Sequence, residues 1–182
     1  MTFNPHHDPT HLYFVTATVV GWKQLFVERS YANIVLQSWD WHRRHGRWSL
    51  FAFVLMPDHA HLIIKPAGDL SISDVLQSFG SYTAHVILDQ LQEDGRGDLL
   101  AFFAQRQERD AGKDHQIWQP IEAKNVYSVA FLRQKVAYIH NNPVAKRWRL
   151  VEDRADYVYS SACFYDRGDT PIIPVDDVGE WM

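Results

Sequence analysis

The order of strand-like and helix-like segments most strongly limits what this 182-residue chain can fold into. Four segments are expected as strands, the first of them rich in β-branched and aromatic residues: residues 11–22, 48–57, 59–66 and 115–120. Residues 29–46 and 71–92 instead carry apolar side chains three and four positions apart, as on one face of a helix. The order strand, helix, strand, strand, helix, strand predicts a ferredoxin-like α+β fold, an antiparallel sheet with two helices on one face.

Local signals place the ends of these elements and a third helix. The Pro-Asp pair at 57–58 predicts a tight turn between two strands. Ser71 and Asp74 are a capping pair at a helix start. Residues 93–114 are charged and contain glycine, so a loose insertion is expected there. Residues 128–142 predict a further helix, stopped by proline, which follows the six sheet-forming elements.

Length and composition favour one globular domain over residues 1–182, with an acidic, proline-containing tail from about residue 166. Hydrophobic residues make up 46% and charged residues 22% of the chain, and most of the seven tryptophans are expected in the core. No apolar run is long enough for a membrane span, and the first residues lack the pattern of a signal peptide. The single cysteine cannot form an internal disulfide, which favours a cytoplasmic setting.

The charged residues are unevenly distributed along the chain, so the net charge alone does not describe its surface. The net charge is −4, which argues mildly against nucleic-acid binding. Residues 124–149, however, contain six basic and no acidic residues, whereas the chain from 150 onward contains eight acidic residues and two arginines. Such a basic stripe can attract phosphate even when the total charge is negative. A solvated helix face explains the same pattern equally well.

His59 and His61 are the first candidate site residues. Residues two apart on a strand point to the same face, so both imidazoles should project together. Imidazole is the commonest neutral metal ligand, but two of them do not complete a site. Read alone, the pair is better explained as two ordinary histidines beside a turn.

The predicted helix at 128–142 offers partners for the pair. Tyr138 lies off its apolar stripe, and Lys135 and Asn142 lie one turn to either side of it on the same face. Ordinary explanations exist: tyrosine is common at the edge of a packed helix, and asparagine before proline is a common helix end. Pro143 should also push Asn142 away from helical geometry.

Two other tyrosines compete with Tyr138 for the role of nucleophile. Tyr82 lies close to the apolar stripe of its helix and is expected in the core. Tyr127 lies at a helix start without a polar partner spaced like Asn142. Tyr138 is therefore the favoured nucleophile.

Three motifs together resemble a known family. The stretches VLMPDHAHLIIKP (54–66), QKVAYIHNNPV (134–144) and YVYSSACFY (157–165) are similar to those of the IS200-like tyrosine transposases, most closely the REP-associated branch. These enzymes are of the HUH class, meaning histidine, hydrophobic residue, histidine. The resemblance covers about residues 11–165.

The resemblance implies a ferredoxin-like fold with the histidine pair on a central strand. It implies a divalent metal, Mg²⁺ or Mn²⁺, and cleavage and rejoining of single-stranded DNA at hairpin or palindromic ends through a 5′-phosphotyrosine. Carried over by motif, Tyr138 is the nucleophile, and His59, His61 and Asn142 are the metal ligands. Relatives act as dimers or monomers, so a homodimer is possible.

Further residues are expected to assist the proposed nucleophile and to bind the DNA. Lys135, through its helical spacing, could favour the phenolate of Tyr138, whose ordinary pKa is near 10. Basic residues are expected to contact DNA phosphates: Arg133, Lys146, Arg147, Arg149, Arg43 and Arg44. The alternative function is a domesticated protein that binds DNA hairpins without cutting them.

Overall fold

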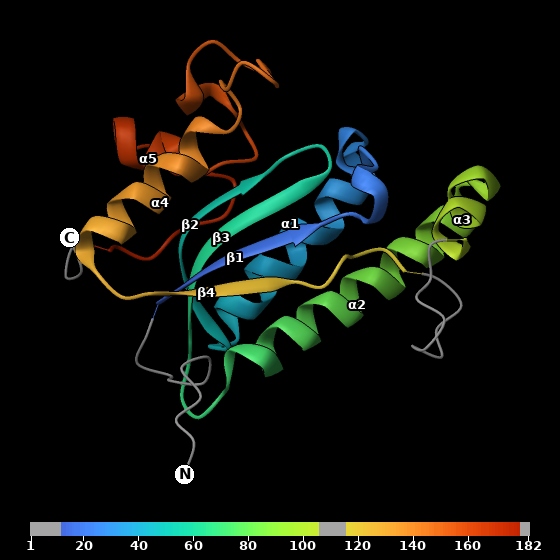
Figure 1. Cartoon of the computed structure of the whole chain (residues 1–182), viewed down its shortest axis with the longest axis horizontal. Coiled ribbons are helices and arrows are strands. Elements are labelled where there is room, and N and C mark those ends of the chain that lie inside the picture. Colours follow the sequence, from blue (N-terminus) through green and yellow to red (C-terminus); the bar gives the residue numbers. More distant parts are fainter. Residues whose placement is uncertain (1–11, 106–115, 179–182) are drawn as a thin grey trace.

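A four-stranded antiparallel sheet forms the centre of the protein. The computed structural model describes residues 12–105 and 116–178. The strands lie in the order β2-β3-β1-β4, with these bounds: β1 Leu12–Thr18, β2 Trp48–Leu55, β3 His59–Pro66 and β4 Glu122–Val126. The two inner strands, β1 and β3, pair along their length. The predicted ferredoxin-like fold is confirmed (Figure 1).

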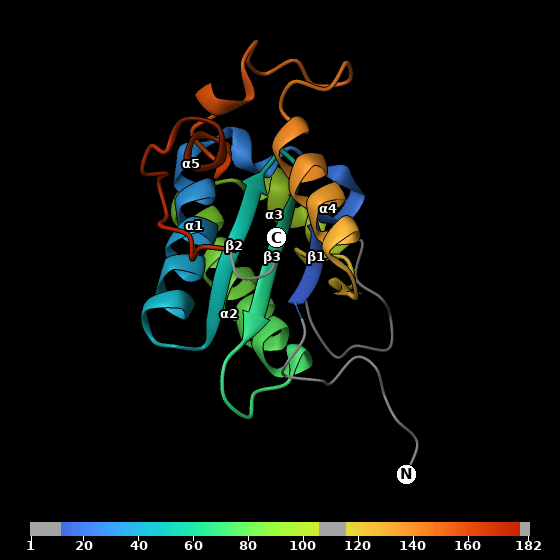
Figure 2. The ribbon, with the colours of Figure 1, turned by 90° about the vertical axis from the view of Figure 1, so that its left-hand side faces the viewer.

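Helices cover both faces of the sheet. The long helices α1 (Arg29–Arg44) and α2 (Ile72–Glu93) pack on one face, and α4 (Val129–Asn141) packs on the other (Figure 2). The remaining helical segments are short: η1 Val20–Trp22, η2 Leu25–Val27, α3 Gly97–Ala104, η3 Arg154–Asp156 and α5 Ala162–Arg167. In the part of the chain that the structure describes, no helix could cross a membrane.

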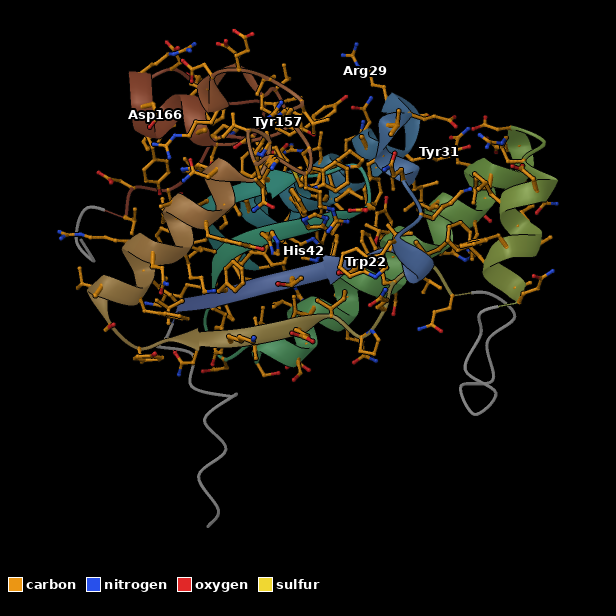
Figure 3. The ribbon with its side chains drawn as sticks, turned by 45° about the horizontal axis from the view of Figure 1, so that its top comes forward. Trp22, Arg29, Tyr31, His42, Tyr157 and Asp166 are labelled. Carbon is orange, nitrogen blue, oxygen red and sulfur yellow. The ribbon has the colours of Figure 1, made fainter. Side chains whose placement is uncertain are left out.

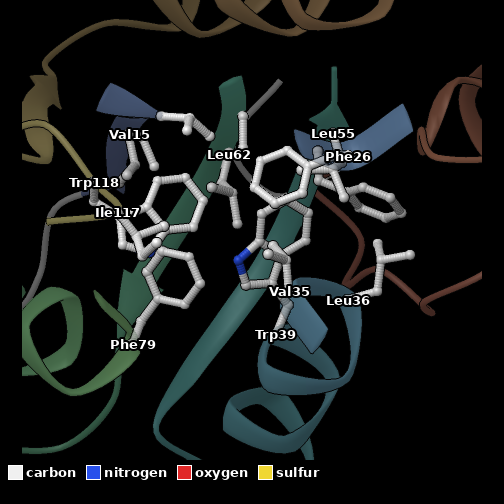
Figure 4. Packing of buried hydrophobic residues seen from close by; sticks show 14 of the residues in the cluster. Val15, Phe26, Val35, Leu36, Trp39, Leu55, Leu62, Phe79, Ile117 and Trp118 are labelled. Carbon is white, nitrogen blue, oxygen red and sulfur yellow. The ribbon is translucent and has the colours of Figure 1, made fainter. Parts of the chain in front are cut away.

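The alternation of side chains in β1 creates two separate cores. Tyr13 and Val15 point toward α1 and α2, where they join a buried cluster that also contains Phe53. Figure 4 shows Val15 of this cluster with Trp39 of α1 and Phe79 of α2. Leu12 and Phe14, one position away, point to the opposite face and pack with Leu132, Val136 and Ile139 of α4. Because both faces are buried, a slip by one residue would move every side chain of a strand into the core of the opposite face and disrupt the packing of both.

Two of the three predicted helices, α2 and α4, begin with a side-chain cap. The backbone N–H of Asp74 donates to Ser71 Oγ at 3.1 Å, and Asp74 Oδ2 accepts from the Ser71 N–H, which completes a capping box. At α4, the Phe131 N–H donates to Ser128 Oγ at 3.1 Å. The expected distortion before Pro143 is absent, since Asn142 keeps helical angles, φ −54° and ψ −48°.

The structure corrects three sequence predictions of secondary structure. The first strand ends at Thr18, because Gly21 and Trp22 turn the chain with φ values of 64° and 55°. The fourth strand is β4 rather than 115–120, where Trp118 makes only an isolated bridge with Val19. The expected loose insertion contains α3, whose buried Leu99 and Phe103 join the core; its residues 106–114 lie outside the described ranges.

One buried hydrogen bond holds the segment before β4 against α2. Trp118 Nε1 donates to Thr83 Oγ1 at 3.0 Å, and the Thr83 hydroxyl donates to the Phe79 carbonyl at 2.8 Å. We expect Thr83→Val to lower the free energy of unfolding by about 1–3 kcal/mol, because it leaves the indole N–H buried without an acceptor. Urea unfolding measures this, and the loss should shrink in a Trp118→Phe background, which has no such donor. Equal losses in both backgrounds would contradict the explanation.

The acidic tail is not a free extension. Asp176 accepts hydrogen bonds from the Leu50 backbone N–H and from Arg43, both at 2.9 Å, and its own N–H donates to the Leu50 carbonyl at 2.7 Å. Val178 is buried in the cluster on the α4 face. The tail therefore runs along β2, the edge strand, and helps to cover it.

His42 makes folding sensitive to acid. Its ring is buried on α1, Nδ1 donates to the Ser38 carbonyl at 2.7 Å, and the ring stacks on Trp48. Burial, with a smaller contribution from the charges of Arg47 and His45, lowers its pKa below the ordinary value of 6.5. The unfolded chain therefore binds a proton that the folded chain does not, and stability falls as the pH falls below about 6.5.

The contribution of His42 can be isolated by substitution. We expect His42→Gln, whose side-chain amide can still donate to Ser38, to reduce the loss of unfolding free energy between pH 6.5 and 5. One proton can account for a slope of at most about 1.4 kcal/mol per pH unit. The measurement is denaturant unfolding of both proteins across this range. Parallel pH profiles would contradict the assignment.

Candidate active site

His59 and His61 lie side by side on the sheet face covered by α4. The register pairs them with Thr18 and Thr16 of β1, and their ring centroids are 5.0 Å apart. Both side chains are buried. The prediction that the pair shares one face of a strand is confirmed.

Hydrogen bonds at the Nδ1 atoms orient the two rings. His59 Nδ1 lies 2.5 Å from Asp58 Oδ1, and His61 Nδ1 lies 3.1 Å from Thr16 Oγ1. A carboxylate oxygen accepts from an Nδ1–H, so this contact favours the tautomer of the neutral His59 ring that has its proton on Nδ1 and its lone pair on Nε2. His61 has the same arrangement when its Nδ1 donates to the threonine hydroxyl. Both Nε2 atoms are then available as ligands.

The surroundings of His61 keep it neutral. Burial, followed by the nearby charges of His59 and Lys135, lowers the pKa of His61 to about 3, against the opposing effect of a hydrogen bond with the Val15 backbone. A metal ligand must be unprotonated, and His61 meets this condition throughout the neutral range.

Tyr138 on α4 lies directly against this pair. Its ring centroid is 5.1 Å from that of His61 and 6.0 Å from that of Phe14, and Phe14 stacks on His61 at 5.2 Å. Tyr138 is 48% exposed, so its ring borders the histidines while solvent still reaches it. A tyrosine 77 positions away in sequence is thus brought to the histidine pair within one chain.

Lys135 and Asn142 flank Tyr138 on the same helix. Lys135 Nζ lies 4.4 Å from the Phe14 ring centroid and 5.3 Å from that of Tyr138. Asn142 Nδ2 donates to the Tyr138 carbonyl at 2.8 Å, which leaves Asn142 Oδ1 free to accept or to ligate. Within the described contacts, Asn142 is hydrogen-bonded to Tyr138 rather than to either histidine.

A cluster of Trp22, Arg147 and Trp148 borders His59 on its other side. The Arg147 guanidinium lies 5.6 Å from the Trp22 ring centroid and 5.0 Å from that of Trp148. Its Nη2 is 3.7 Å from Asp58 Oδ2. The ring centroid of His59 lies 6.1 Å from that of Trp22 and 6.0 Å from that of Trp148.

The predicted DNA-contacting residues fall into two groups. Arg133 is exposed on α4, and Lys146, Arg147 and Arg149 are exposed just after it. Of these, Arg147 is the one with a described contact at the site, to Asp58 beside His59. Arg43 and Arg44 instead lie at the end of α1, paired with Asp176 and Asp40. The chain next enters β2 opposite Pro66, at the far end of β3 and about 23 Å from His59. The structure does not bring this second group to the site.

The competing tyrosines are both remote from the histidines. Tyr82 is 57% exposed on α2, so its predicted place in the core is wrong, and it lies on the opposite face of the sheet. Tyr127 is exposed before α4 and stacks on Phe131, with ring centroids 4.9 Å apart. Among the described tyrosines, Tyr138 alone has a ring contact with His59 or His61.

Sequence reasoning missed Asp58, Thr16 and Trp22. Asp58 was interpreted only as a turn residue, although a carboxylate next to a histidine is a common way to orient the ring. Thr16 could not be found, because its contact depends on the register between β1 and β3. Of the six described tryptophans, three are buried and Trp148 packs against the core on the α4 face, whereas Trp22 is 52% exposed beside His59.

The donor set decides what kind of cation could bind. Among the described residues, no three or more His, Cys, Asp or Glu side chains form a metal-binding group. A site here needs a different oxygen as third ligand, and the Asn142 amide oxygen on the Tyr138 face fits this need. Two neutral imidazoles and an amide leave the full positive charge of a divalent cation available to a phosphate.

The comparison with protein families finds a likeness over part of the chain. Residues 21–104 match the family model of IS200-like transposases. This segment therefore resembles those transposases, as the motifs indicated. This segment contains the histidine pair and ends before Tyr138.

A solved structure shares the whole fold. The structure of the REP-associated tyrosine transposase bound to a REP hairpin aligns with 98% of this chain and 93% of that one, with a TM-score of 0.65 and 20% sequence identity. The likeness of fold therefore extends beyond residue 104 and includes α4. No curated protein matches this chain.

Proposed function

We propose that this protein cuts and rejoins single-stranded DNA at hairpin ends, using a divalent metal and a 5′-phosphotyrosine intermediate on Tyr138. The observation that carries the proposal is the 5.1 Å separation of the Tyr138 and His61 rings in one chain. An exposed tyrosine against two oriented, metal-competent histidines has the parts that transfer of a phosphodiester to a tyrosine needs.

His59 and His61, through Nε2, and Asn142, through Oδ1, would hold Mg²⁺ or Mn²⁺. When bound, the metal would neutralise charge on the non-bridging oxygens of the phosphate. Neutral ligands bind such hard cations weakly, because carboxylates and other charged oxygens are preferred. We therefore expect weak metal binding by the free protein and tighter binding once a DNA phosphate adds its own oxygen.

Tyr138 would attack phosphorus, and the bond from phosphorus to the 3′ oxygen of the neighbouring nucleotide would break. The phenol proton passes to solvent, and the departing oxygen takes up a proton to become a 3′-hydroxyl. Lys135, with Nζ 5.3 Å from the Tyr138 ring, would stabilise the phenolate. Because the phosphotyrosine retains a phosphodiester, attack by a 3′-hydroxyl reverses the step and rejoins DNA without ATP.

The DNA partner is supported by charge and by likeness. Arg147, one of three exposed basic residues after α4, lies 3.7 Å from Asp58 beside His59, and the structural relative was solved with a REP hairpin. Since Tyr138 and the histidines come from the same chain, one copy supplies all the proposed catalytic groups. A homodimer is therefore not required for the chemistry.

The test is the formation of a covalent adduct. Labelled hairpin DNA with single-stranded flanks is incubated with the protein and Mn²⁺, and the products are separated under denaturing conditions. We expect a protein–DNA adduct that disappears when EDTA is added. Tight hairpin binding without an adduct on any flank sequence would favour the non-cutting alternative.

Asp58 should influence the site through metal affinity. Its carboxylate holds His59 by Nδ1 at 2.5 Å. We expect Asp58→Asn to weaken Mn²⁺ binding by about 10- to 100-fold, because the amide holds the ring and its tautomer less firmly. Calorimetric titration with Mn²⁺ in the presence of uncleavable DNA measures the affinity. Asp89→Asn, at an exposed carboxylate on α2, is the matched control and should bind as the parent does; equal affinities for all three proteins would contradict this role.

A further inference from the structure

We propose that Trp22 and Arg147 form a stacking subsite for one unpaired nucleobase, next to the phosphate that Tyr138 attacks. The location beside the reacting phosphate rests on the proposed function. Base binding itself can be measured without cleavage.

The backbone holds Trp22 in solvent at the edge of the site. Trp22 lies just past the end of β1, in a turn where its φ is 55°, an uncommon value for a residue with a side chain (Figure 3). Its N–H donates to the Val19 carbonyl at 2.9 Å, and the Val19 N–H donates to the Asp58 carbonyl at 2.9 Å. The turn is thus fastened to the residue before His59. Strained backbone that keeps a large indole exposed points to binding rather than folding.

Arg147 connects this indole to the histidine pair. Its guanidinium lies over the rings of Trp22 and Trp148, and its Nη2 is 3.7 Å from Asp58 Oδ2. Asp58 is buried and holds His59 through its other oxygen. One carboxylate therefore fixes both the guanidinium and a proposed metal ligand, so a base on Trp22 would sit in a defined position relative to the metal.

The chemistry of the surface selects a nucleobase as occupant. Lys146, Arg147 and Arg149 lie within four positions, in a stretch from 124 to 149 that has no acidic residue. Exposed aromatic rings beside basic side chains are the combination that binds single strands, by stacking on bases and by attraction of phosphates. The base must be unpaired, because paired bases hide their faces in the helix stack.

The experiment uses the Tyr138→Phe protein, so that binding is not followed by covalent attachment. The DNA is a labelled hairpin with a single-stranded flank, and a series of otherwise identical DNAs each carries one abasic position in the flank. Fluorescence anisotropy gives the affinities. Trp22→Ala should weaken binding of intact DNA by roughly tenfold or more. This loss should vanish on the DNA that lacks the base at one particular position.

Two further variants control the interpretation. Trp22→Phe keeps an aromatic face and should recover much of the affinity. It also preserves the measurement if Trp22→Ala does not fold, since its weaker stacking should be sensitive to the same abasic position. Trp41→Ala is the matched control, because Trp41 is 45% exposed and stacks on His45 at the far end of the sheet. It should bind DNA as the parent does.

The proposal is overturned if the Trp22 variants bind as the parent does, or lose affinity equally on intact and every abasic DNA. Adduct formation by the unsubstituted protein is scored separately. A position-specific loss without any adduct would keep the stacking subsite and reject the nuclease function. An adduct without a position-specific loss would reject the subsite and keep the nuclease.

Discussion

Tyr138→Phe is expected to abolish covalent attachment to DNA, lowering adduct formation by more than about a thousandfold, as removal of an enzyme nucleophile does. The substitution deletes one oxygen and keeps the ring that packs against His61 and Phe14. Fold and DNA binding should therefore be retained. The measurement is the yield of adduct over time with hairpin DNA and Mn²⁺.

Tyr127→Phe is the matched control for this result. Tyr127 is also an exposed tyrosine beside α4, but it stacks on Phe131 instead of a histidine. It should form adduct at the rate of the unsubstituted protein. Equal adduct from Tyr138→Phe and Tyr127→Phe would show that the nucleophile is elsewhere.

His61→Ala should have the second-largest effect. It removes a buried imidazole with its Nε2 free and so removes one of only three proposed ligands. Loss of metal-based charge stabilisation is worth several kcal/mol, so we expect cleavage to slow by about a thousandfold or more. The remaining rate should no longer depend on Mn²⁺ concentration, whereas the unsubstituted protein should respond until its site is saturated.

His85→Ala separates this effect from the general loss of a histidine. His85 is exposed on α2, on the opposite face of the sheet, and pairs with Asp89. Its substitution should leave both the rate and the Mn²⁺ dependence unchanged. A His61→Ala protein that is folded and still responds normally to Mn²⁺ would exclude His61 as a ligand.

Sequence patterns predicted the elements whose signals are local. The strand 59–66 and the helix starts at Ser71 and Ser128 depend on neighbouring residues, and the structure has them where expected. The fourth strand was misplaced because β4 is an edge strand with only one buried residue, so its sequence lacks the apolar pattern of an inner strand. Only its pairing with β1 defines it.

The candidate site was predictable where residues share one element. Tyr138, Lys135 and Asn142 could be grouped by helical spacing, and the histidines by strand alternation. That these two groups meet depends on α4 packing across the sheet face of Phe14, which no local pattern specifies. Arg43 and Arg44 were expected at the DNA because they lie near Trp41 and Trp48 in sequence, but the fold separates them from the histidines.

The most direct test is to identify the residue that becomes covalently linked to DNA. After incubation with hairpin DNA and Mn²⁺, the adduct is digested with nuclease and trypsin and analysed by mass spectrometry. Cleavage after Lys135 and Lys146 releases residues 136–146, whose single tyrosine is Tyr138; Tyr127 leaves on the peptide 125–133. We predict a nucleotide on the peptide 136–146. A nucleotide on the peptide 125–133, or on any other tyrosine, would contradict the central claim.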